Sequence, residues 1–465
     1  MFFNRCLSFS IIFFIVFTST CCALKIEISR GNIEPDPIAI VEFFEKDGNN
    51  SDMGSKISKI IKNDLDMCGL FIPIDKDLFL ESPEDLAKNG HNIKNWHVLK
   101  ARFLLYGKIN QTFSSRFEID YKLIDVVTGE IMLESQVSGN EPKLRKVAHV
   151  IADQVYERIT NERGYFNTHI IYAESSSKAG VRRKTRLVKI DQDGENVEEI
   201  TDGSELTLMA RYSTDGKNIA FISYRDNVKK GDILGKSAHV YVMNLENRKQ
   251  RLLINKPLML ELIKKNNNKP IQMTYAPRFS SDGAMAVLGI IIDGKSAIYI
   301  LDIEKNELKP LTKHTCIDTS PCFSPDDSKI VFTSNRQGQE ALYIMDKDGK
   351  NQQRISKEGG KYSQPVWSPR GDLIAFAKSL RGKFYIGLMK PDGTGERLVS
   401  GDYLVEAPCW ASNGRYISYS MEAGPSARSN IAVVDMTGNH IRIIETRKDA
   451  TYPAWSPTLA ITTVK

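Results

Sequence analysis

Two short acidic stretches are the parts of this sequence best suited to binding a metal ion. Residues 191–196 read DQDGEN and residues 346–351 read DKDGKN, and alternating carboxylates followed by glycine are typical of calcium-binding loops. Both stretches lack the third acidic residue and the distal glutamate that complete such a loop. Each stands where a hairpin would join two strands, so we interpret both as turns, with calcium binding as the alternative.

Other motifs for catalysis or metal binding are lacking in the sequence. It contains no G-x-S-x-G nucleophile motif, and its seven histidines never occur in pairs at the spacing of zinc ligands. A sialidase-type site, with a tyrosine nucleophile and acidic and arginine partners, is not recognisable from spacing either. We therefore predict a protein that is not an enzyme and that needs no cofactor or metal.

An aromatic motif recurs through the second part of the chain and indicates how this part is built. Two copies read PCFSPDD (321–327) and PVWSPRG (365–371), and successive aromatic residues of the motif are 67, 44, 44, 43 and 45 residues apart. After each of the first five comes a polar turn and then an apolar run, which predicts two antiparallel strands joined by a tight turn. The six aromatic residues are Tyr212, Phe279, Phe323, Trp367, Trp410 and Trp455. We interpret them as packing residues between neighbouring repeats.

Two more strands follow each pair, so that each repeat contains four. A period of about 44 residues with four strands is typical of a propeller blade, here with the innermost strand first. A short fourth strand closes each of these repeats. The third strands are expected at residues 240–244, 298–302, 342–346, 385–389 and 431–435.

The two ends of the repeat region predict a closed ring. Residues 170–173, 187–191 and 197–201 form a blade that lacks only its innermost strand, and residues 452–457 supply an innermost strand with nothing after it. Together they complete one blade, so we predict a six-bladed β-propeller closed by the C-terminal strand. Closure removes the exposed edge that an open array of strands would present.

The region ahead of the repeats has the pattern of an α+β domain. Residues 38–44 read as a buried strand, and apolar residues at helical spacing between 53 and 65 predict a helix that ends near Gly69. A second helix is expected from near Pro142 to just before Gly164. We expect the helices and strands to pack in two layers. Three strands are expected between the helices, over residues 102–109, 117–126 and 130–137.

The first 23 residues have the layout of a secretory signal peptide. Arg5 precedes an apolar stretch, residues 7–17, and small residues then lead to Ala23. We expect cleavage after Ala23, with a lipoprotein acylated at Cys21 or Cys22 as the alternative. No later segment is apolar enough to span a bilayer, so the mature chain is expected in an exported compartment. The formal net charge of +6 is small beside 63 basic and 57 acidic residues and does not indicate nucleic-acid binding.

Four cysteines remain after the signal peptide, namely Cys68, Cys316, Cys322 and Cys409. Exported proteins form disulfides readily, so a bond between Cys316 and Cys322 is one possibility. Cys322 and Cys409, however, stand at a motif position that other repeats fill with arginine, valine or alanine. We interpret these two as small packing residues.

Six such repeats behind a signal peptide and a domain of about 140 residues resemble the TolB family, the periplasmic propellers of the Tol-Pal system. The likeness extends into the first domain, in DLDMCGLFIPID (64–75), WHVLKARFLLYGKI (96–109) and YERITNERGYFNTHIIYA (156–173). The resemblance implies a monomeric, non-enzymatic binding protein that supports outer-membrane integrity and invagination at cell division. The alternative is a hydrolase or small-ligand-binding protein that uses the propeller channel. The expected divisions are 1–23 for the signal peptide, 24–165 for the N-terminal domain and 166–465 for the propeller.

The resemblance also implies two partners, the peptidoglycan-associated lipoprotein Pal on the propeller and TolA at the N-terminal segment. Each innermost strand runs toward its polar turn, so the loops before the motif lie on the opposite face, and the N-terminal domain is expected on the turn face. We expect Pal on the face opposite the turns. Its expected contact residues are Met273, Thr274, Tyr275, Ala276, Ile317, Asp318, Thr319, Ser320, Ser363, Gln364, Glu406 and Ala407.

The first residues of the mature chain match the position of the TolA-binding segment of the family. Apolar and polar residues alternate, which predicts a short strand with one apolar face. A strand at a chain end costs little to detach and can pair with the edge of another sheet. We predict a switch between docking on its own protein and binding TolA, biased by Pal; a permanently docked strand is the alternative. The segment comprises Leu24, Lys25, Ile26, Glu27, Ile28, Ser29, Arg30, Gly31, Asn32 and Ile33.

Two insertions depart from the compact repeat, at residues 225–238 and 255–272. Both are rich in lysine, and we predict that they lengthen loops into a basic rim beside the channel opening; basic loops that are merely solvated are the alternative. An acidic partner would then associate at a salt-dependent rate. The rim would be joined by Lys178, Arg182, Arg183, Lys184 and Arg186 of the first blade.

Overall fold

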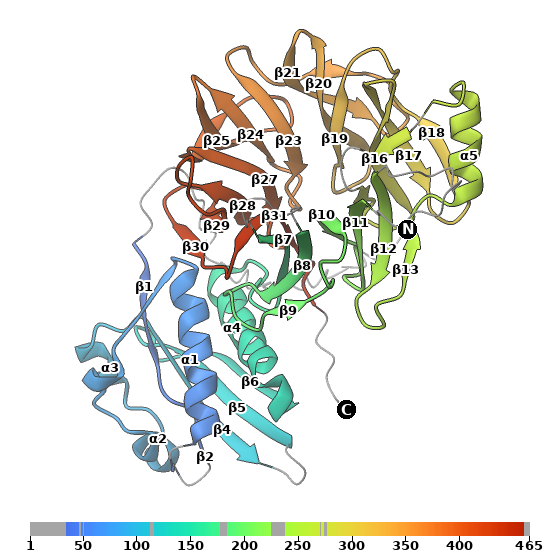
Figure 1. Cartoon of the computed structure of the whole chain (residues 1–465). Coiled ribbons are helices and arrows are strands. Elements are labelled where there is room, and N and C mark those ends of the chain that lie inside the picture. The colour runs from blue at the N-terminus through green and yellow to red at the C-terminus, as the bar shows by residue number, and fades with distance from the viewer. Residues whose placement is uncertain are drawn as a thin grey trace, which may run out of the picture.

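The protein has two parts, an N-terminal domain and a ring of β-sheets, as the computed structural model in Figure 1 shows. The structure describes residues 34–45, 48–49, 51–111, 116–176, 184–224, 238–269, 271–273 and 277–459. The expected signal peptide and the segment 24–33 therefore lie outside the described residues. Among the helices of the described part, none has the length and apolar character needed to cross a membrane.

A mixed six-stranded sheet forms the centre of the N-terminal domain. Its strand order is β3-β1-β4-β5-β6, and the short β2 also pairs with β4. Strand β1 runs parallel to both β3 and β4, whereas β5 is antiparallel to its neighbours β4 and β6. The strands are β1 (Asp36–Ile40), β2 (Phe44–Glu45), β3 (Phe71–Pro73), β4 (Phe103–Gln111), β5 (Arg116–Asp125) and β6 (Ile131–Asn140).

Helices α1 (Asp52–Met67) and α4 (Leu144–Thr160) cover one face of this sheet. Helix α1 lies against the sheet because Ile57, Ile61 and Leu65 recur at helical spacing, and all three are fully buried. Helix α4 follows a single 3₁₀ turn, η2 (Glu141–Lys143), and ends at Asn161 in a left-handed conformation. The two helices predicted from periodicity are therefore confirmed.

The prediction of two layers is wrong, because two short helices cover part of the other face. These are α2 (Pro83–Asn89) and α3 (Ile93–Val98), which follow the 3₁₀ turn η1 (Lys76–Leu78). Trp96 of α3 is fully buried against β4, and its Nε1 donates to Glu81 at 2.6 Å. The unbroken apolar run at 38–44 is typical of a strand buried on both faces and could have indicated this third layer.

From His169 onward the chain forms antiparallel sheets around a common axis, a β-propeller (Figure 1). Four sheets are separate, and the three that follow β18 have their four strands in chain order. The four sheets comprise β14 (Ile271–Met273), β15 (Arg278–Phe279), β16 (Met285–Ile292), β17 (Lys295–Asp302) and β18 (Glu307–Pro310); β19 (Asp318–Phe323), β20 (Lys329–Gln337), β21 (Gln339–Asp346) and β22 (Gln353–Arg354); β23 (Lys361–Trp367), β24 (Ile374–Leu380), β25 (Lys383–Met389) and β26 (Arg397–Asp402); and β27 (Leu404–Trp410), β28 (Tyr416–Glu422), β29 (Asn430–Asp435) and β30 (Ile441–Ile444).

The remaining strands form one sheet of eight. A single residue pair, Leu206 with Thr185, joins β10 to β8 in parallel, and the C-terminal β31 pairs with β7. Residues from the first and the last part of the propeller therefore share a sheet. Its strands are β7 (His169–Ser176), β8 (Lys184–Asp191), β9 (Glu198–Glu199), β10 (Leu206–Tyr212), β11 (Asn218–Tyr224), β12 (Ala238–Asn244), β13 (Gln250–Leu252) and β31 (Asp449–Trp455).

The polar turns after the aromatic motif have the predicted backbone conformation. Gly371 and Gly414 have φ angles of 79° and 66°, and Asp327 takes the same place with φ 57°. Positive φ is what a tight hairpin requires at this position. The carboxylate of Asp327 also accepts from the Ser281 backbone N–H, at 2.9 Å for Oδ2, and so connects the turns of two neighbouring sheets.

The tryptophans of the motif pack between sheets. Trp367, Trp410 and Trp455 are 5–8% exposed, and Trp410 Nε1 donates to the backbone oxygen of Val366 on the neighbouring innermost strand at 3.0 Å. The predicted packing role of these residues is confirmed.

The insertion at 255–272 is a helix, not a loop. Helix α5 (Lys256–Lys265) begins where the Asn255 side chain accepts from Leu258 N–H, and its Met259 is buried in the adjacent core. Figure 1 shows α5 at the outer edge of the ring. The prediction of a basic rim is wrong for α5, and also for Arg186, which forms ion pairs with Glu174 and Glu199 at 2.6 and 2.5 Å. Residues 225–237, Lys178, Arg182 and Arg183 lie outside the described residues.

Candidate functional site

A channel along the axis of the propeller is lined by the innermost strands. A cavity of about 250 Å³ lies in it, and the aromatic residues of all six motifs contribute to its wall. A smaller cavity above it forms the mouth of the channel. The mouth is lined by Arg211, Arg278, Ser320, Pro321, Gln364, Pro365, Val366, Ala407, Pro408 and Tyr452.

Three of the predicted contact residues, Ser320, Gln364 and Ala407, meet at this mouth. Each precedes a proline and has a positive φ angle, of 52°, 53° and 55° respectively. Residues before proline favour extended backbone, and positive φ is uncommon for residues other than glycine. Their strands also show a register shift at the same place. Strain of this kind gathers at functional sites, and here it recurs around one opening.

The other predicted contact residues differ in how accessible they are. Ile317 is 45% exposed, and Thr319, Ser363 and Glu406 are partly buried. Thr274, Tyr275 and Ala276 lie outside the described residues.

Four of the predicted contact residues are buried: Ser320 and Ala407 at the mouth, 8% and 2% exposed, and also Met273 and Asp318. Met273 is buried in the core of its sheet. The Asp318 carboxylate is buried and lies 3.1 Å from Arg336 Nη2. In this structure the Met273 and Asp318 side chains are packed inside the propeller and are not exposed on the surface predicted to bind Pal.

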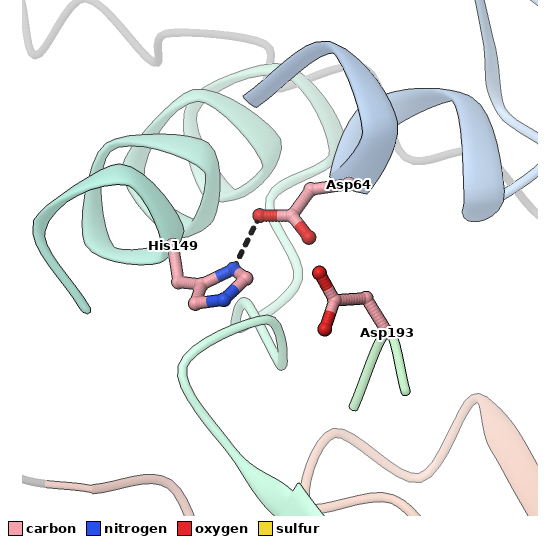
Figure 2. A group of neighbouring side chains, drawn as sticks. All are labelled: Asp64, His149 and Asp193. Atoms are coloured by element: carbon pink, nitrogen blue, oxygen red, sulfur yellow. Dashed lines mark hydrogen bonds and ion pairs between the residues drawn. The ribbon is translucent and has the colours of Figure 1, made fainter. Parts of the chain in front are cut away.

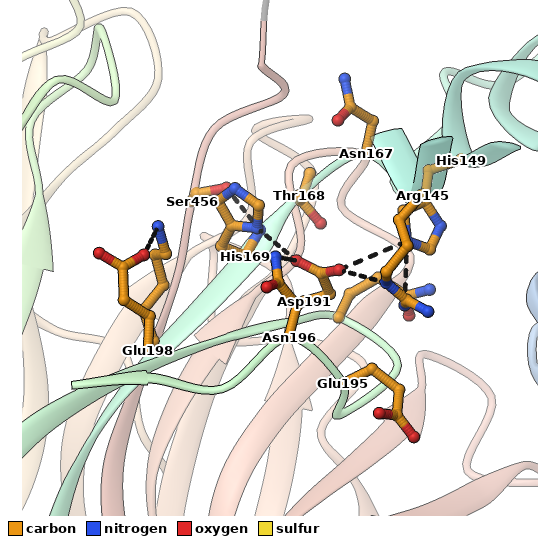
Figure 3. Close-up of polar contacts among 12 residues, drawn as sticks. Arg145, His149, Asn167, Thr168, His169, Asp191, Glu195, Asn196, Glu198 and Ser456 are labelled. Atoms are coloured by element: carbon orange, nitrogen blue, oxygen red, sulfur yellow. Dashed lines mark hydrogen bonds and ion pairs between the residues drawn. The ribbon is translucent and has the colours of Figure 1, made fainter. Parts of the chain in front are cut away.

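The two domains meet in a buried polar cluster, drawn in Figure 3. Arg145 of α4 donates from Nε to Asp191 Oδ2 at 2.9 Å and from Nη2 to Asp193 Oδ2 at 2.6 Å. His169 Nδ1 lies 3.2 Å from Asp191 Oδ1. Burial disfavours ionised Asp191, but contacts with His149, His169 and Arg145 outweigh it and lower the pKa of this carboxyl. Charged groups of α4 thus pair with the first hairpin of the propeller.

Asp64 and His149 form the most buried pair of this cluster. Figure 2 shows the His149 ring directed at Asp64, with Nδ1 and Oδ2 2.6 Å apart. The other oxygen of Asp64 accepts from Gln192 Nε2 at 2.9 Å. Burial opposes a charged imidazole, but the carboxylates of Asp64, Asp191 and Asp193 outweigh it and raise the pKa of His149 to about 10. His149 is therefore protonated at neutral pH.

Asp64, His149 and Asp193 also bring one imidazole and two carboxylates within 4.8 Å of one another. Such a donor set can hold a divalent ion. Both oxygens of Asp64, however, already accept hydrogen bonds, Asp193 accepts from Arg145, and a protonated imidazole has no lone pair to offer. The cluster therefore functions as a hydrogen-bond network between the domains.

The contact between protonated His149 and Asp64 predicts that the folded protein becomes less stable at alkaline pH. The pKa of His149 is about 10 in the folded protein and about 6.5 when unfolded, so its contribution is complete below about pH 6.5 and is lost as the pH rises through about 10. The free energy of unfolding should fall by up to about 1.4 kcal/mol per pH unit over this range.

Urea unfolding at several pH values between these limits tests this prediction. The slope should flatten in a His149→Gln variant and persist in a His97→Gln variant, because His97 is exposed on α3. Equal slopes in all three proteins would contradict it.

Further contacts place the N-terminal domain on the turn side of the propeller, as predicted. Arg370 and Tyr416 follow the aromatic motif at its polar turns, and His440 lies in the turn before β30. The contacts are Tyr416 Oη with Cys68 O at 2.7 Å, His440 Nε2 with Met67 O at 2.9 Å, and Arg370 Nη2 with Glu162 Oε2 at 3.0 Å.

Comparison with known proteins decides the family. The model of the TolB beta propeller domain matches residues 156–459, and the model of the TolB amino-terminal domain matches residues 24–132. The chain belongs to the TolB family.

Individual TolB proteins resemble this chain to different extents. The Tol-Pal system protein TolB of Paramagnetospirillum magneticum is 39% identical over 237 residues, which are 51% of this chain and 50% of that protein. The match thus spans about half the length of that relative. The crystal structure of TolB from Acinetobacter baumannii has a TM-score of 0.77 at 22% identity and covers 91% of this chain and 97% of its own, which shows a shared fold.

The acidic stretches of this TolB-family chain form turns. Gly194 N–H donates to Asp191 O and Gly349 N–H to Asp346 O, at 3.0 and 2.9 Å. The Asp346 carboxylate accepts from Lys329 and Asn351. The Asp346 oxygens that a calcium ion would need already accept hydrogen bonds from a lysine and an asparagine of the protein.

The four cysteines of the described chain are free thiols. Cys322 and Cys409 are buried, as expected of packing residues. Cys316 Sγ lies 3.3 Å from Asp318 Oδ1, not bonded to Cys322.

Sequence reasoning missed the arginines of the channel mouth and the polar cluster at the domain junction. Arg211 and Arg278 stand directly before the motif aromatic. The other repeats have cysteine, valine or alanine at this position, so the two charged residues could have been recognised as exceptions. Asp64 and His149 are 85 residues apart in the chain, and no comparable exception marks them.

Proposed function

We propose that this chain is a non-enzymatic component of the Tol-Pal system that binds Pal through the channel mouth of the propeller and TolA through residues 24–33. The observation that carries the proposal is the convergence of Ser320, Gln364 and Ala407, with their strained backbone, on one opening opposite the N-terminal domain. Such a complex would contribute to outer-membrane integrity and to invagination at division. Family membership supports a place in this system.

We also infer that the propeller has six blades. The eight-stranded sheet divides naturally at the single residue pair between β8 and β10, which leaves β31-β7-β8-β9 and β10 to β13 as two blades. The shift in register between Thr451 and Ala454 of β31 matches the shift in the other innermost strands. In this arrangement β31 closes the ring.

The expected export signal and the family support a periplasmic location. The described chain starts at Glu34, and the next residue, Pro35, lines a cavity of about 270 Å³ between the domains together with Cys68, Arg415 and His440. The described chain thus begins beside the junction. We infer that residues 24–33, which precede it, are accessible to TolA.

A Thr319→Arg variant tests the proposed Pal site. A long charged side chain beside the mouth should block a closely packed partner, so we expect Pal binding to weaken by about tenfold or more, measured by calorimetry with purified Pal. Ser328→Arg is the matched control, because Ser328 is exposed at the opposite end of the same sheet. An Ala276→Arg variant should behave like Thr319→Arg.

Deletion of residues 24–33 provides the reciprocal test. It should abolish TolA binding, while the protein still binds Pal and the propeller keeps its melting transition. If folded Thr319→Arg and Ala276→Arg proteins bind Pal as the unmodified protein does, the assigned face is wrong.

A further inference from the structure

Two arginines stand side by side in the propeller channel. Arg211 and Arg278 occupy the same motif position, directly before the aromatic residue, on the innermost strands β10 and β15. Both line the mouth and the wider cavity beneath it. Burial, and then the charge of Arg278, lower the pKa of Arg211, which agrees with two guanidinium groups lying close together.

Their charges are not balanced within the described part of the chain. Arg211 Nη1 donates only to the backbone oxygens of Ala210 and Pro453, at 2.7 and 3.5 Å. The Arg278 side chain makes no hydrogen bond or ion pair with any described residue, although its backbone pairs with β16. No aspartate or glutamate is among the described residues that line the two cavities. Glu406, near the mouth, instead bonds Tyr452 and Gln364, and burial raises its pKa.

Three other arginines of this protein with low exposure are paired with carboxylates, whereas Arg442 donates to the backbone and side-chain oxygens of Gln192. Arg336 lies 3.1 Å from Asp318, Arg145 lies 2.6 Å from Asp193, and Arg415 lies 3.4 Å from Glu162. Desolvated charges normally require such partners. Two unbalanced guanidinium groups in one channel therefore point to an anion supplied from outside the chain.

The lining of the mouth indicates which anion fits. A guanidinium group binds a carboxylate through two parallel hydrogen bonds. Pro321, Pro365 and Val366 add apolar contacts beside the charged groups, which suit an aliphatic stem. We propose that Arg211 and Arg278 form a binding site for a carboxylate on a short aliphatic stem, either a free small carboxylate or an acidic side chain of the bound partner. The second source rests on the proposed function.

Calorimetry with succinate tests the site directly. The unmodified protein should bind succinate but not succinamide, its uncharged analogue. Arg278→Gln should weaken succinate binding by about tenfold, because it removes hydrogen bonds to a charged group, and Arg211→Gln should act in the same way. Arg163→Gln is the control, since Arg163 is exposed on the loop between α4 and β7. Arg278→Gln should keep the unmodified melting temperature, because the Arg278 side chain bonds no described residue.

A second arm with purified Pal identifies the source of the carboxylate. If the two channel variants weaken Pal binding and Arg163→Gln does not, the partner supplies it. If they weaken only succinate binding, the ligand is a free carboxylate. Failure of the unmodified protein to bind Pal would count against the proposed function and leave the succinate result to decide the site. Absence of succinate binding, together with unchanged Pal binding in both channel variants, would overturn the inference.

Discussion

An Asp64→Ala variant is expected to lose about 3–5 kcal/mol of the free energy of unfolding. Asp64 is fully buried and bonds both His149, 2.6 Å away, and Gln192 of the propeller. Its removal leaves the protonated imidazole without its nearest carboxylate and the Gln192 amide without an acceptor. Urea unfolding followed by tryptophan fluorescence measures the loss.

Asp52→Ala on the same helix is the matched control for Asp64→Ala. Asp52 pairs with Lys56 at 2.7 Å, but its side chain is 84% exposed, and surface pairs of this kind contribute little to stability. Equal losses for the two variants would show that the buried network does not stabilise the domain junction.

Removal of the last strand should have the largest effect on the propeller. A chain that ends at Lys448 lacks β31, which pairs with β7 on one side. On the other side Tyr452 N–H donates to Ser420 Oγ and Ser429 Oγ donates to Ala450 O, at 2.9 and 3.0 Å. Without β31 the edge of β7 is exposed, and in the proposed six-bladed arrangement the ring is open. We expect the propeller to lose its cooperative melting transition in calorimetry.

A chain that ends at Leu459 is the control for the truncation, because it keeps β31 and its contacts. A point variant, Trp455→Ala, should cost about 3–5 kcal/mol, since Trp455 is 5% exposed and its Nε1 donates to Thr168 Oγ1 at 2.8 Å. A normal cooperative transition after truncation at Lys448 would contradict a closing role for β31.

Periodicity in the sequence predicted the elements whose environment repeats. The aromatic motif with its polar turn located the innermost strands, because each copy meets the same neighbours, and helices α1 and α4 followed from their single apolar faces. The side on which the N-terminal domain lies followed from strand direction alone.

Features that depend on tertiary contacts could not be predicted from the periodicity of the sequence. The meeting of Arg211 with Arg278 requires the ring to form, and the Asp318 to Arg336 pair requires the register of β19 and β20. The lysines of 255–272 suggested a basic loop, although Leu258, Leu262 and Met259 already have the spacing of a buried helix face.

The position of β1 affects how the protein bears mechanical tension. The chain passes from Glu34 directly into β1, which lies between β3 and β4 and is parallel to both. A pull on the amino end therefore acts along two hydrogen-bond ladders at once, in shear, and their bonds share the force instead of breaking one after another. We therefore expect β1 to resist a pull applied at Glu34 better than a strand with a single neighbour would.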